Sequence, residues 1–201
     1  RSKRSVAEEL GLTRRALTKE FQRFFGRSLE PPIPPDLHPE LLIVDGKYIQ
    51  GRQLCVLTAV TEQDRIFWRF ASEEAYGTWY AFLIRFPHPP KIVVADGHKG
   101  MAQFAKRWWP HTAFQRCHFH MVLLITSYLS RNPKDEAGRV ILDLAHRLKR
   151  VKTVEDRDQW KLLHKIWEKQ YEKFFAEKTE LGNYAHKKLR SVRFIMRRAL
   201  P

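Results

Sequence analysis

The chain has 201 residues, 43% of them hydrophobic and 29% charged, which is enough for one domain with a core or for two small ones. Its longest aliphatic runs are far shorter than the roughly 20 apolar residues that span a bilayer, and its two cysteines are too few for a disulfide framework. The formal charge of +15 points to a polyanionic partner, with nucleic acid as the first candidate and ribosomes or anionic lipid as alternatives. We therefore expect a cytoplasmic protein that does not enter the membrane.

Residues 1–28 are predicted to form a helix-turn-helix arm. Apolar residues at helical spacing are interrupted at Gly11, and Thr13 is of a residue type that caps helices. The second helix presents polar side chains able to reach phosphates or base edges in a major groove, namely Arg14, Arg15, Thr18 and Lys19. The alternative is a basic helical hairpin that packs or binds protein. Residues 29–40, which include Pro31, Pro32, Pro34 and Pro35, are predicted to be a linker.

From residue 41 onward the pattern is that of a mixed sheet. Runs rich in β-branched residues predict a three-stranded meander with strands at 41–45, 54–60 and 66–70, joined by polar segments at 46–53 and 61–65. A helix over 73–85, a strand over 91–96, a helix over 100–109 and a strand over 113–117 follow. Strand, helix and strand with apolar runs predict at least one parallel pair, with helices covering the sheet.

Beyond residue 119 only helical spacing is found. Helices are predicted at 120–131, 134–150, 154–177 and 184–199. The sequence therefore predicts an α/β fold, with a sheet domain over 41–120 and a helical lobe over 121–201. Most of the six tryptophans are expected to lie in the core, and at most one or two to stack on unpaired bases. The candidates for stacking are Trp160 and Trp167, which lie seven residues apart on one predicted helix face.

Two aspartates end predicted strands in the same local pattern, an apolar run followed by Asp and Gly. Asp45 follows one strand and Asp96 another, and a meander that leads into a crossover places these two strands side by side. Two carboxylates at the mouth of a sheet repel each other, and a divalent cation relieves the repulsion. Such a pair suits phosphoryl transfer assisted by Mg²⁺ or Mn²⁺. The alternative is that each Asp-Gly is a turn.

A third acid is not evident from the sequence. The candidates Glu168, Glu172, Glu177 and Glu180 lie among lysines, where pairing between residues four apart on a helix explains them.

Cys117 and His120 lie three residues apart after the last predicted strand. Zinc prefers four such ligands, and no matching pair accompanies these two, so the sequence leaves open whether they bind zinc. A Cys–His nucleophile pair is a second reading, and a structural Cys117 with a locally hydrogen-bonded His120 is the third.

Together these motifs resemble bacterial insertion-sequence transposases related to the Mutator group, which have a DDE site on an RNase H-like fold. The resemblance rests on residues 42–46, 93–100, 115–120 and 186–193, which read LIVDG, VVADGHKG, QRCHFH and HKKLRSVR. The helix-turn-helix before these motifs also matches the family's plan.

The resemblance implies roles for particular residues. Asp45 and Asp96 would be the first two metal-binding acids, with Mg²⁺ as the ion, and Cys117 and His120 would be a signature pair that supports the site. Residues 121–201 would belong to an all-helical insertion into the RNase H-like core. The third acid, a Glu, would lie on a helix after that insertion, and we expect it to be missing from this chain, which reads as a piece of a longer one.

We therefore expect a DDE transposase that cleaves DNA at transposon ends and transfers strands into target DNA. The expected partners are terminal inverted repeats, target DNA and further copies of the chain in an oligomer on DNA, and the expected location is the bacterial nucleoid. Two alternatives are a truncated, non-catalytic DNA-binding protein and an RNase H-like nuclease. Metal dependence separates the first alternative from the transposase, and strand joining separates the second.

Overall fold

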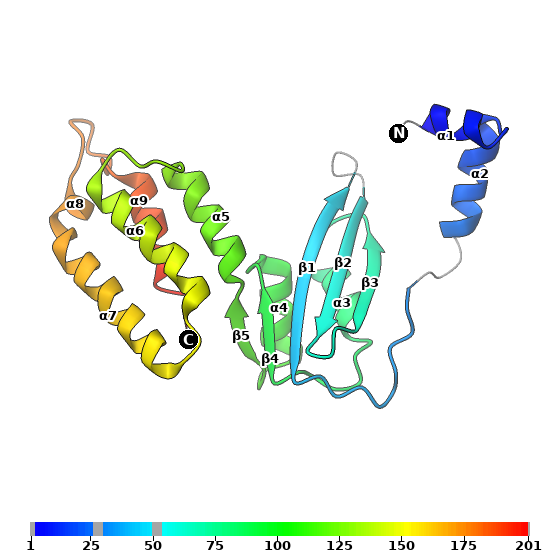
Figure 1. Cartoon of the computed structure of the whole chain (residues 1–201), viewed down its shortest axis with the longest axis horizontal. Coiled ribbons are helices and arrows are strands. Elements are labelled where there is room, and N and C mark those ends of the chain that lie inside the picture. Colours follow the sequence, from blue (N-terminus) through cyan, green and yellow to red (C-terminus); the bar gives the residue numbers. More distant parts are fainter. Residues whose placement is uncertain (1–2, 26–29, 50–53, 201) are drawn as a thin grey trace.

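The computed structural model describes residues 3–25, 30–49 and 54–200. Along the chain these residues form a helical arm, a five-stranded sheet with two helices, and a helical lobe at the opposite end of the molecule from the arm (Figure 1). Among the described helices, none has the length and apolar character needed to cross a membrane.

The arm consists of two helices, α1 (Lys3–Glu9) and α2 (Arg14–Phe25), joined by a tight turn. Gly11 has a φ of +63°, a conformation that glycine adopts without strain, and the Leu12 amide donates to the Ala7 carbonyl at 2.9 Å. Thr13 caps α2, because its Oγ1 accepts from the Ala16 amide at 3.1 Å. The predicted helices and cap are confirmed. The predicted boundary between residues 28 and 29 lies outside the described residues.

The sheet has the strand order β3-β2-β1-β4-β5. Its strands are β1 (Leu41–Ile49), β2 (Leu54–Thr61), β3 (Ile66–Ala71), β4 (Ile92–Ala95) and β5 (Ala113–Arg116). The pairs β1–β2 and β2–β3 are antiparallel, whereas β1–β4 and β4–β5 are parallel. The predicted meander and parallel pairing are therefore confirmed, and β1 lies at the centre of the sheet.

The end of the first strand was predicted wrongly. Residues 46–49 were expected to belong to a polar joint, but they continue β1 and pair with β2, as Gly46 does with Leu57 and Ile49 with Leu54. The longer ladder satisfies backbone groups that a loop would leave to water, and this outweighs the turn preference of Asp-Gly. Residues 50–53 of the same predicted joint lie outside the described residues.

Helices α3 (Tyr76–Leu83) and α4 (Lys99–Trp108) pack on one face of the sheet, behind the strands in Figure 1. This face carries a hydrophobic core whose largest buried side chains include Leu42, Leu57, Trp79, Phe82 and Phe104. On the opposite face, Ile43, Ile66 and Ile92 are each exposed by more than two-fifths. Along β1, side chains therefore alternate between the covered and the open face.

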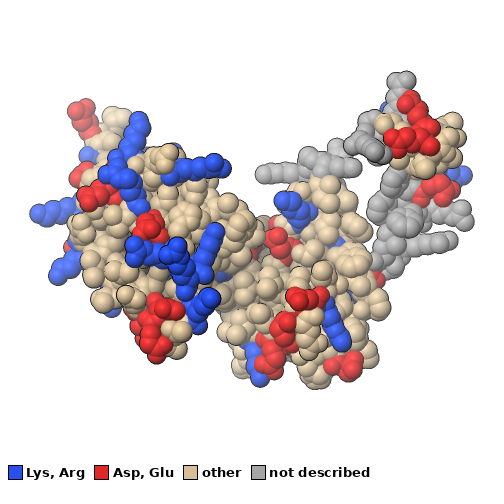
Figure 2. All heavy atoms as spheres, in the orientation of Figure 1, with Lys and Arg blue, Asp and Glu red and all other residues tan. Residues whose placement is uncertain are grey.

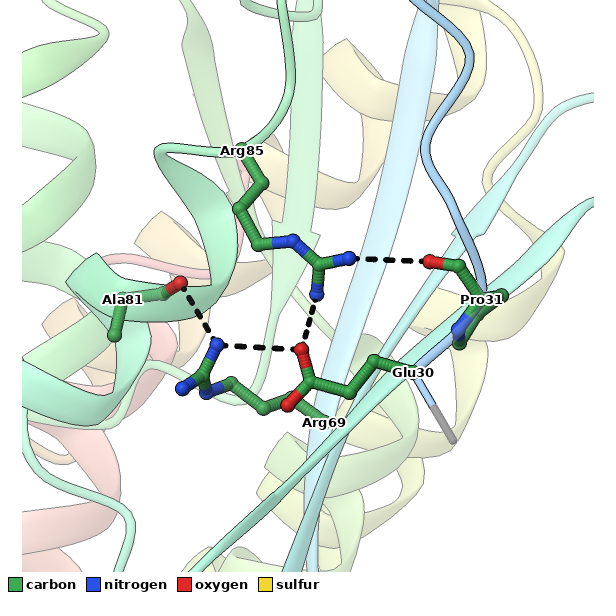
Figure 3. Close-up of polar contacts among 5 residues, drawn as sticks. All are labelled: Glu30, Pro31, Arg69, Ala81 and Arg85. Atoms are coloured by element: carbon green, nitrogen blue, oxygen red, sulfur yellow. Dashed lines mark hydrogen bonds and ion pairs between the residues drawn. The ribbon is translucent and has the colours of Figure 1, made fainter. Parts of the chain in front are cut away.

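The segment after the arm is anchored to the sheet domain through Glu30 (Figure 3). The Glu30 Oε2 atom accepts from Arg85 at 2.5 Å, just beyond α3, and from Arg69 of β3 at 3.3 Å. Arg85 also donates to the Pro31 carbonyl at 3.1 Å, and Arg69 to the Ala81 carbonyl at 3.3 Å. Because the two guanidinium groups are mostly buried, this network fixes where the linker leaves the sheet domain.

The helical lobe has a second hydrophobic core. Its helices are α5 (His118–Leu129), α6 (Glu136–Arg147), the 3₁₀ turn Leu148–Arg150, α7 (Val154–Gln170), α8 (Glu172–Ala176) and α9 (Lys187–Met196). Trp160 and Trp167 are buried there, and their indole N–H groups donate to the Leu144 and Ala137 carbonyls of α6 at 2.9 and 3.0 Å. The expectation that these two residues stack on bases is wrong, because their shared face packs against α6.

His164 lies between these two tryptophans, with ring centroids 5.4 Å from Trp160 and 5.9 Å from Trp167. Its Nε2 atom is buried without a hydrogen-bond partner. Burial lowers the pKa of His164 below its usual 6.5; Glu168 on the same helix opposes this shift, while Arg193 and Arg197 beside it add to it. The lobe therefore holds a neutral imidazole in its core.

This histidine makes the lobe sensitive to acid. Since its pKa is lower in the folded than in the unfolded chain, the unfolded chain takes up the proton first, and stability is lost as the pH falls through and below about 6.5. We expect His164→Leu to reduce the loss in the free energy of unfolding between about pH 7.5 and about pH 5.5, measured by urea denaturation. An equal loss in both proteins would contradict this.

Candidate active site

Asp45 and Asp96 lie on neighbouring parallel strands at the centre of the sheet. In the parallel pairing of β1 with β4, the last paired residues are Ile43 and Val94, and each aspartate lies two residues beyond its strand's last residue in that pairing. The predicted juxtaposition of the two strands is therefore confirmed. Asp96 follows the end of β4 as expected, but Asp45 lies within β1 and pairs with Thr58, whose hydroxyl donates to the Asp45 carbonyl at 3.1 Å. The expectation that Asp45 ends its strand is wrong.

The loop after β4 fixes the Asp96 side chain. Its Oδ1 atom accepts from the His98 amide at 2.7 Å, and His98 then caps α4 by accepting from the Gly100 amide at 3.3 Å. Gly97 has a φ of +88°, and a Cβ there would lie 2.6 Å from the Arg116 Nε atom. Only glycine fits both this backbone and this neighbour.

Arg116, the last residue of β5, brings a positive charge to this loop. Its Nη2 atom donates to the Asp96 carbonyl at 3.2 Å, while its Nε atom is buried without a partner. Arg116 was not among the predicted site residues, although it precedes Cys117 in the QRCHFH motif. This arginine therefore holds the loop that carries Asp96 and brings a positive charge next to that acid.

Cys117 and His120 lie at the start of α5. The Cys117 amide donates to the Ala95 carbonyl at 2.6 Å, which ties this helix to the end of β4. His120 is half-buried, its Nε2 atom lies 3.7 Å from Asp45 Oδ1, and its Nδ1 atom is buried without a partner. The geometry brings His120, but not the Cys117 side chain, into contact with an aspartate. His118 instead lies 3.2 Å from the Ala199 carbonyl.

Glu74, which precedes α3, is an acid of this site that was not predicted from the sequence. Its side chain is 9% exposed, and its Oε1 atom has no hydrogen-bond partner. Burial, together with the charges of Asp96 and Asp45, raises the pKa of Glu74 to about 7, while Trp79 and His120 oppose this shift. Glu74 therefore belongs to the same electrostatic site as the two aspartates.

The glutamates of the lobe that were considered for the third acid have other partners or lie elsewhere. Glu168 accepts from Arg193 and Arg197, each at 2.7 Å, and although burial raises the pKa of Glu168, these two bonds lower it below its usual value. Glu177 pairs with His186 at 2.8 Å. Glu172 and Glu180 lie on the lobe, in α8 and just after it. Both acids form charge pairs, but their partners lie in other segments of the chain, so the expectation of pairing between residues four apart on one helix is wrong for Glu168 and Glu177.

The polar residues predicted on the second helix of the arm lie together on one surface. Arg14, Arg15, Thr18 and Lys19 line a shared hollow of about 620 Å³. Arg14, Arg15 and Lys19 are exposed, and the Thr18 hydroxyl donates to the Arg14 carbonyl at 2.8 Å. Lys and Arg are also numerous on the helical lobe, on the face drawn in Figure 2.

These strands and motifs can be compared with known families. The model of the Mutator family of transposases matches residues 42–186, which include most of the lobe and the whole sheet except Leu41. The chain belongs to the Mutator family of transposases. No curated protein matches it significantly. Membership gives this Mutator-family chain a general function in DNA transposition, and DNA as its substrate.

Within this Mutator-family chain the matched region contains every residue of the candidate site, from Asp45 in β1 to His120 in α5. The helices α1 and α2 lie outside the match. In the described part of the chain, no three His, Cys, Asp or Glu side chains are grouped closely enough to hold a metal ion by themselves. Any ion bound here would therefore complete its coordination with water or substrate oxygens.

Proposed function

We propose that this chain carries the catalytic centre of a DDE-type transposase on an RNase H-like domain, with Asp45 and Asp96 as its first two acids. The observation that carries the proposal is the position of these aspartates, two residues beyond paired positions on adjacent parallel strands. A three-stranded meander that leads into two parallel strands supports the RNase H-like assignment.

The chemistry of the donors fits Mg²⁺ or Mn²⁺. These ions take carboxylate and water oxygens, and Mg²⁺ in particular is usually held by one or two carboxylates while it keeps several waters. The Oε1 atom of Glu74 is buried without a hydrogen-bond partner, and the charges of Asp96 and Asp45 add to burial in raising the pKa of this acid, so the site favours neutralisation of its negative charge. A divalent cation, when bound, would supply that neutralisation and stabilise charge on the reacting phosphate. Cys117 and His120 supply only half of a zinc ligand set, so zinc is not part of the proposal.

The reaction proposed has two phosphoryl transfers. In the first, a water oxygen attacks a phosphorus atom at the element's end, the bond to the 3′ oxygen breaks, and that oxygen takes up a proton as a free 3′-hydroxyl. In the second, this hydroxyl loses its proton and attacks a target phosphate, whose own 3′ oxygen leaves. Asp45 and Asp96 hold the centre, His120 positions Asp45, and Arg116 holds the loop of Asp96 through its bond to the Asp96 carbonyl.

The remaining parts of the chain are proposed to bind DNA around this centre. Helices α1 and α2 act as a helix-turn-helix, with Arg14, Arg15, Thr18 and Lys19 facing the groove of the terminal repeat. Helices α5 to α9 form the insertion. Their lysines and arginines are placed to contact the DNA backbone, and further copies of the chain would assemble on the same DNA (Figure 2).

The test is a cleavage and joining assay on DNA that carries the sequences flanking the coding locus. With Mg²⁺ or Mn²⁺ we expect nicks that leave 3′-hydroxyl ends and joining of these ends to a target plasmid, and with EDTA we expect neither. Salt-sensitive binding without any metal-dependent chemistry would favour the DNA-binding alternative, and cleavage without joining would favour a nuclease.

A further inference from the structure

We propose that the aromatic ring of Phe119 is a stacking platform for the DNA base next to the reacting phosphate. The base leaves the duplex stack and lies on the ring, as bases do on aromatic side chains of proteins that bind unpaired nucleic acid. The inference rests on the proposed function and adds to it a DNA contact at the start of α5.

Phe119 lies beside the candidate active site. The His120 Nε2 atom is 3.7 Å from Asp45 Oδ1, and the rings of Phe119 and His120 meet edge to face with their centroids 5.6 Å apart. A single imidazole therefore separates Phe119 from the first aspartate. Asp45 alternates with the buried Val44 along β1, so its side chain lies on the face of the sheet that α3 and α4 leave open.

Phe119 is exposed although it is large and apolar. Its exposed fraction of 55% is the highest of any Phe, Tyr or Trp whose side chain the structure describes. Leu123, four residues further along the same face of α5, is 51% exposed, whereas Met121 and Ile125 of this helix are buried in the core of the lobe. A base covers such a face well, because it offers a flat ring to the aromatic side chain and buries apolar surface.

Positive charge next to the ring favours a base that carries phosphates over an apolar segment of protein. The Lys149 Nζ atom lies 5.6 Å from the centroid of the Phe119 ring. Lys149 and Arg150 are both exposed, on the 3₁₀ turn that contacts α5. While the ring stacks on the base, these cations face the phosphates on either side of it, which is the combination that binds single-stranded nucleic acid.

The test measures the affinity of the chain for duplexes that carry the sequences flanking the coding locus, by fluorescence anisotropy in EDTA so that no strand is cut. One duplex keeps every base, and the others have one base replaced by an abasic residue, at successive positions across the end of the element. We expect Phe119→Leu, which keeps an apolar side chain and removes the ring, to weaken binding to the intact duplex at least about fivefold. Phe119→Trp should bind as tightly as the wild type.

The abasic duplexes show whether the lost contact is with a base. Where the base next to the reacting phosphate is missing, Phe119→Leu and the wild type should bind equally, because the stacking partner is gone. Phe194→Leu is the matched control. Phe194 is 54% exposed on α9, with the Arg198 Cζ atom 4.0 Å from its ring centroid, so the same change is made at a similar ring within the lobe. Its affinity should stay within about twofold of wild type.

Melting curves show whether each variant is folded. Wild-type affinity in folded Phe119→Leu, or an equal loss on the intact and on every abasic duplex, would overturn the inference. It would also be overturned if Phe119→Leu changed self-association in sedimentation velocity without a base-dependent loss, since this face would then bind a second copy of the chain.

Failure of the proposed function gives a different result. If the loss depends on the base but the wild type shows no Mg²⁺-dependent cleavage, the stacking platform stands and the catalytic centre is wrong. If the wild type cleaves DNA and Phe119→Leu shows no base-dependent loss, only the role of Phe119 is wrong. If the wild type does not bind these duplexes, both proposals fail.

Discussion

Asp96→Asn and Asp45→Asn should each reduce metal-dependent DNA cleavage by about a thousandfold or more, which corresponds to about 4 kcal/mol of transition-state stabilisation. Each substitution keeps the size of the side chain and removes one negative charge, two residues beyond the last pair of the parallel strands β1 and β4. The Asp96 Oδ1 atom also accepts from the His98 amide, and an asparagine oxygen preserves that bond. The loss should therefore appear in catalysis and leave the fold intact.

The matched control for both variants is Asp143→Asn, which makes the same charge change in the helical lobe. Asp143 is exposed and pairs with Arg147 at 2.7 Å, four residues along α6. Its replacement should leave cleavage within about twofold of wild type, since such a surface pair contributes little. DNA affinity at fixed salt should be unchanged or slightly higher in all three variants, because an acid has been removed from a basic protein. Retained cleavage in Asp96→Asn would refute the assignment of the centre.

Gly100→Ala should lower the free energy of unfolding by about 2–3 kcal/mol, the usual cost of overpacking a rigid contact. Gly100 is buried in the first turn of α4, where that helix meets α3. A Cβ on Gly100 would lie 2.7 Å from the Tyr76 amide nitrogen and 2.8 Å from the Ala75 carbonyl carbon. Both neighbours are backbone atoms, so no side-chain rotation relieves the clash.

Gly77→Ala on the facing helix is the control, because nothing lies within 4 Å of a Cβ at that position. We expect it to leave stability unchanged or raise it by about 0.5 kcal/mol through helix propensity. Urea denaturation measures both variants. If the two substitutions had equal effects, the close approach of α3 and α4 would not be the reason for glycine at position 100.

The sheet was the part of the fold most readily predicted from the sequence. Its strands are apolar, β-branched runs separated by turn residues, and such runs have few alternative structures. The end of β1 was missed because Asp45-Gly46 has the composition of a turn, whereas its pairing partners lie on β2 and are not visible locally. That Asp45 and Asp96 lie on neighbouring strands was predicted from the topology alone, since a crossover connection places these two strands side by side.

Glu74 could not have been identified from the strand topology. Glu73 and Glu74 are neighbours of the same residue type before a helix, where acids are common because they interact favourably with its N-terminus. What distinguishes Glu74 is its contact with Gly46 of β1, where a Cβ would lie 2.5 Å from the Glu74 Cδ atom. For Trp160 and Trp167, only part of the arrangement could be predicted. Their spacing showed that they share a face, but not that α6 covers it.

The central place of β1 also bears on when the two aspartates meet during folding. The meander β1–β2–β3 is built from neighbouring segments, whereas Leu41 pairs with Ile92 only after the chain has passed through β3 and α3. Contacts between distant segments form later, because the intervening loop must first be closed. A growing chain on the ribosome therefore has its first carboxylate in place well before the second, and cannot assemble the centre until β4 has been synthesised and has docked.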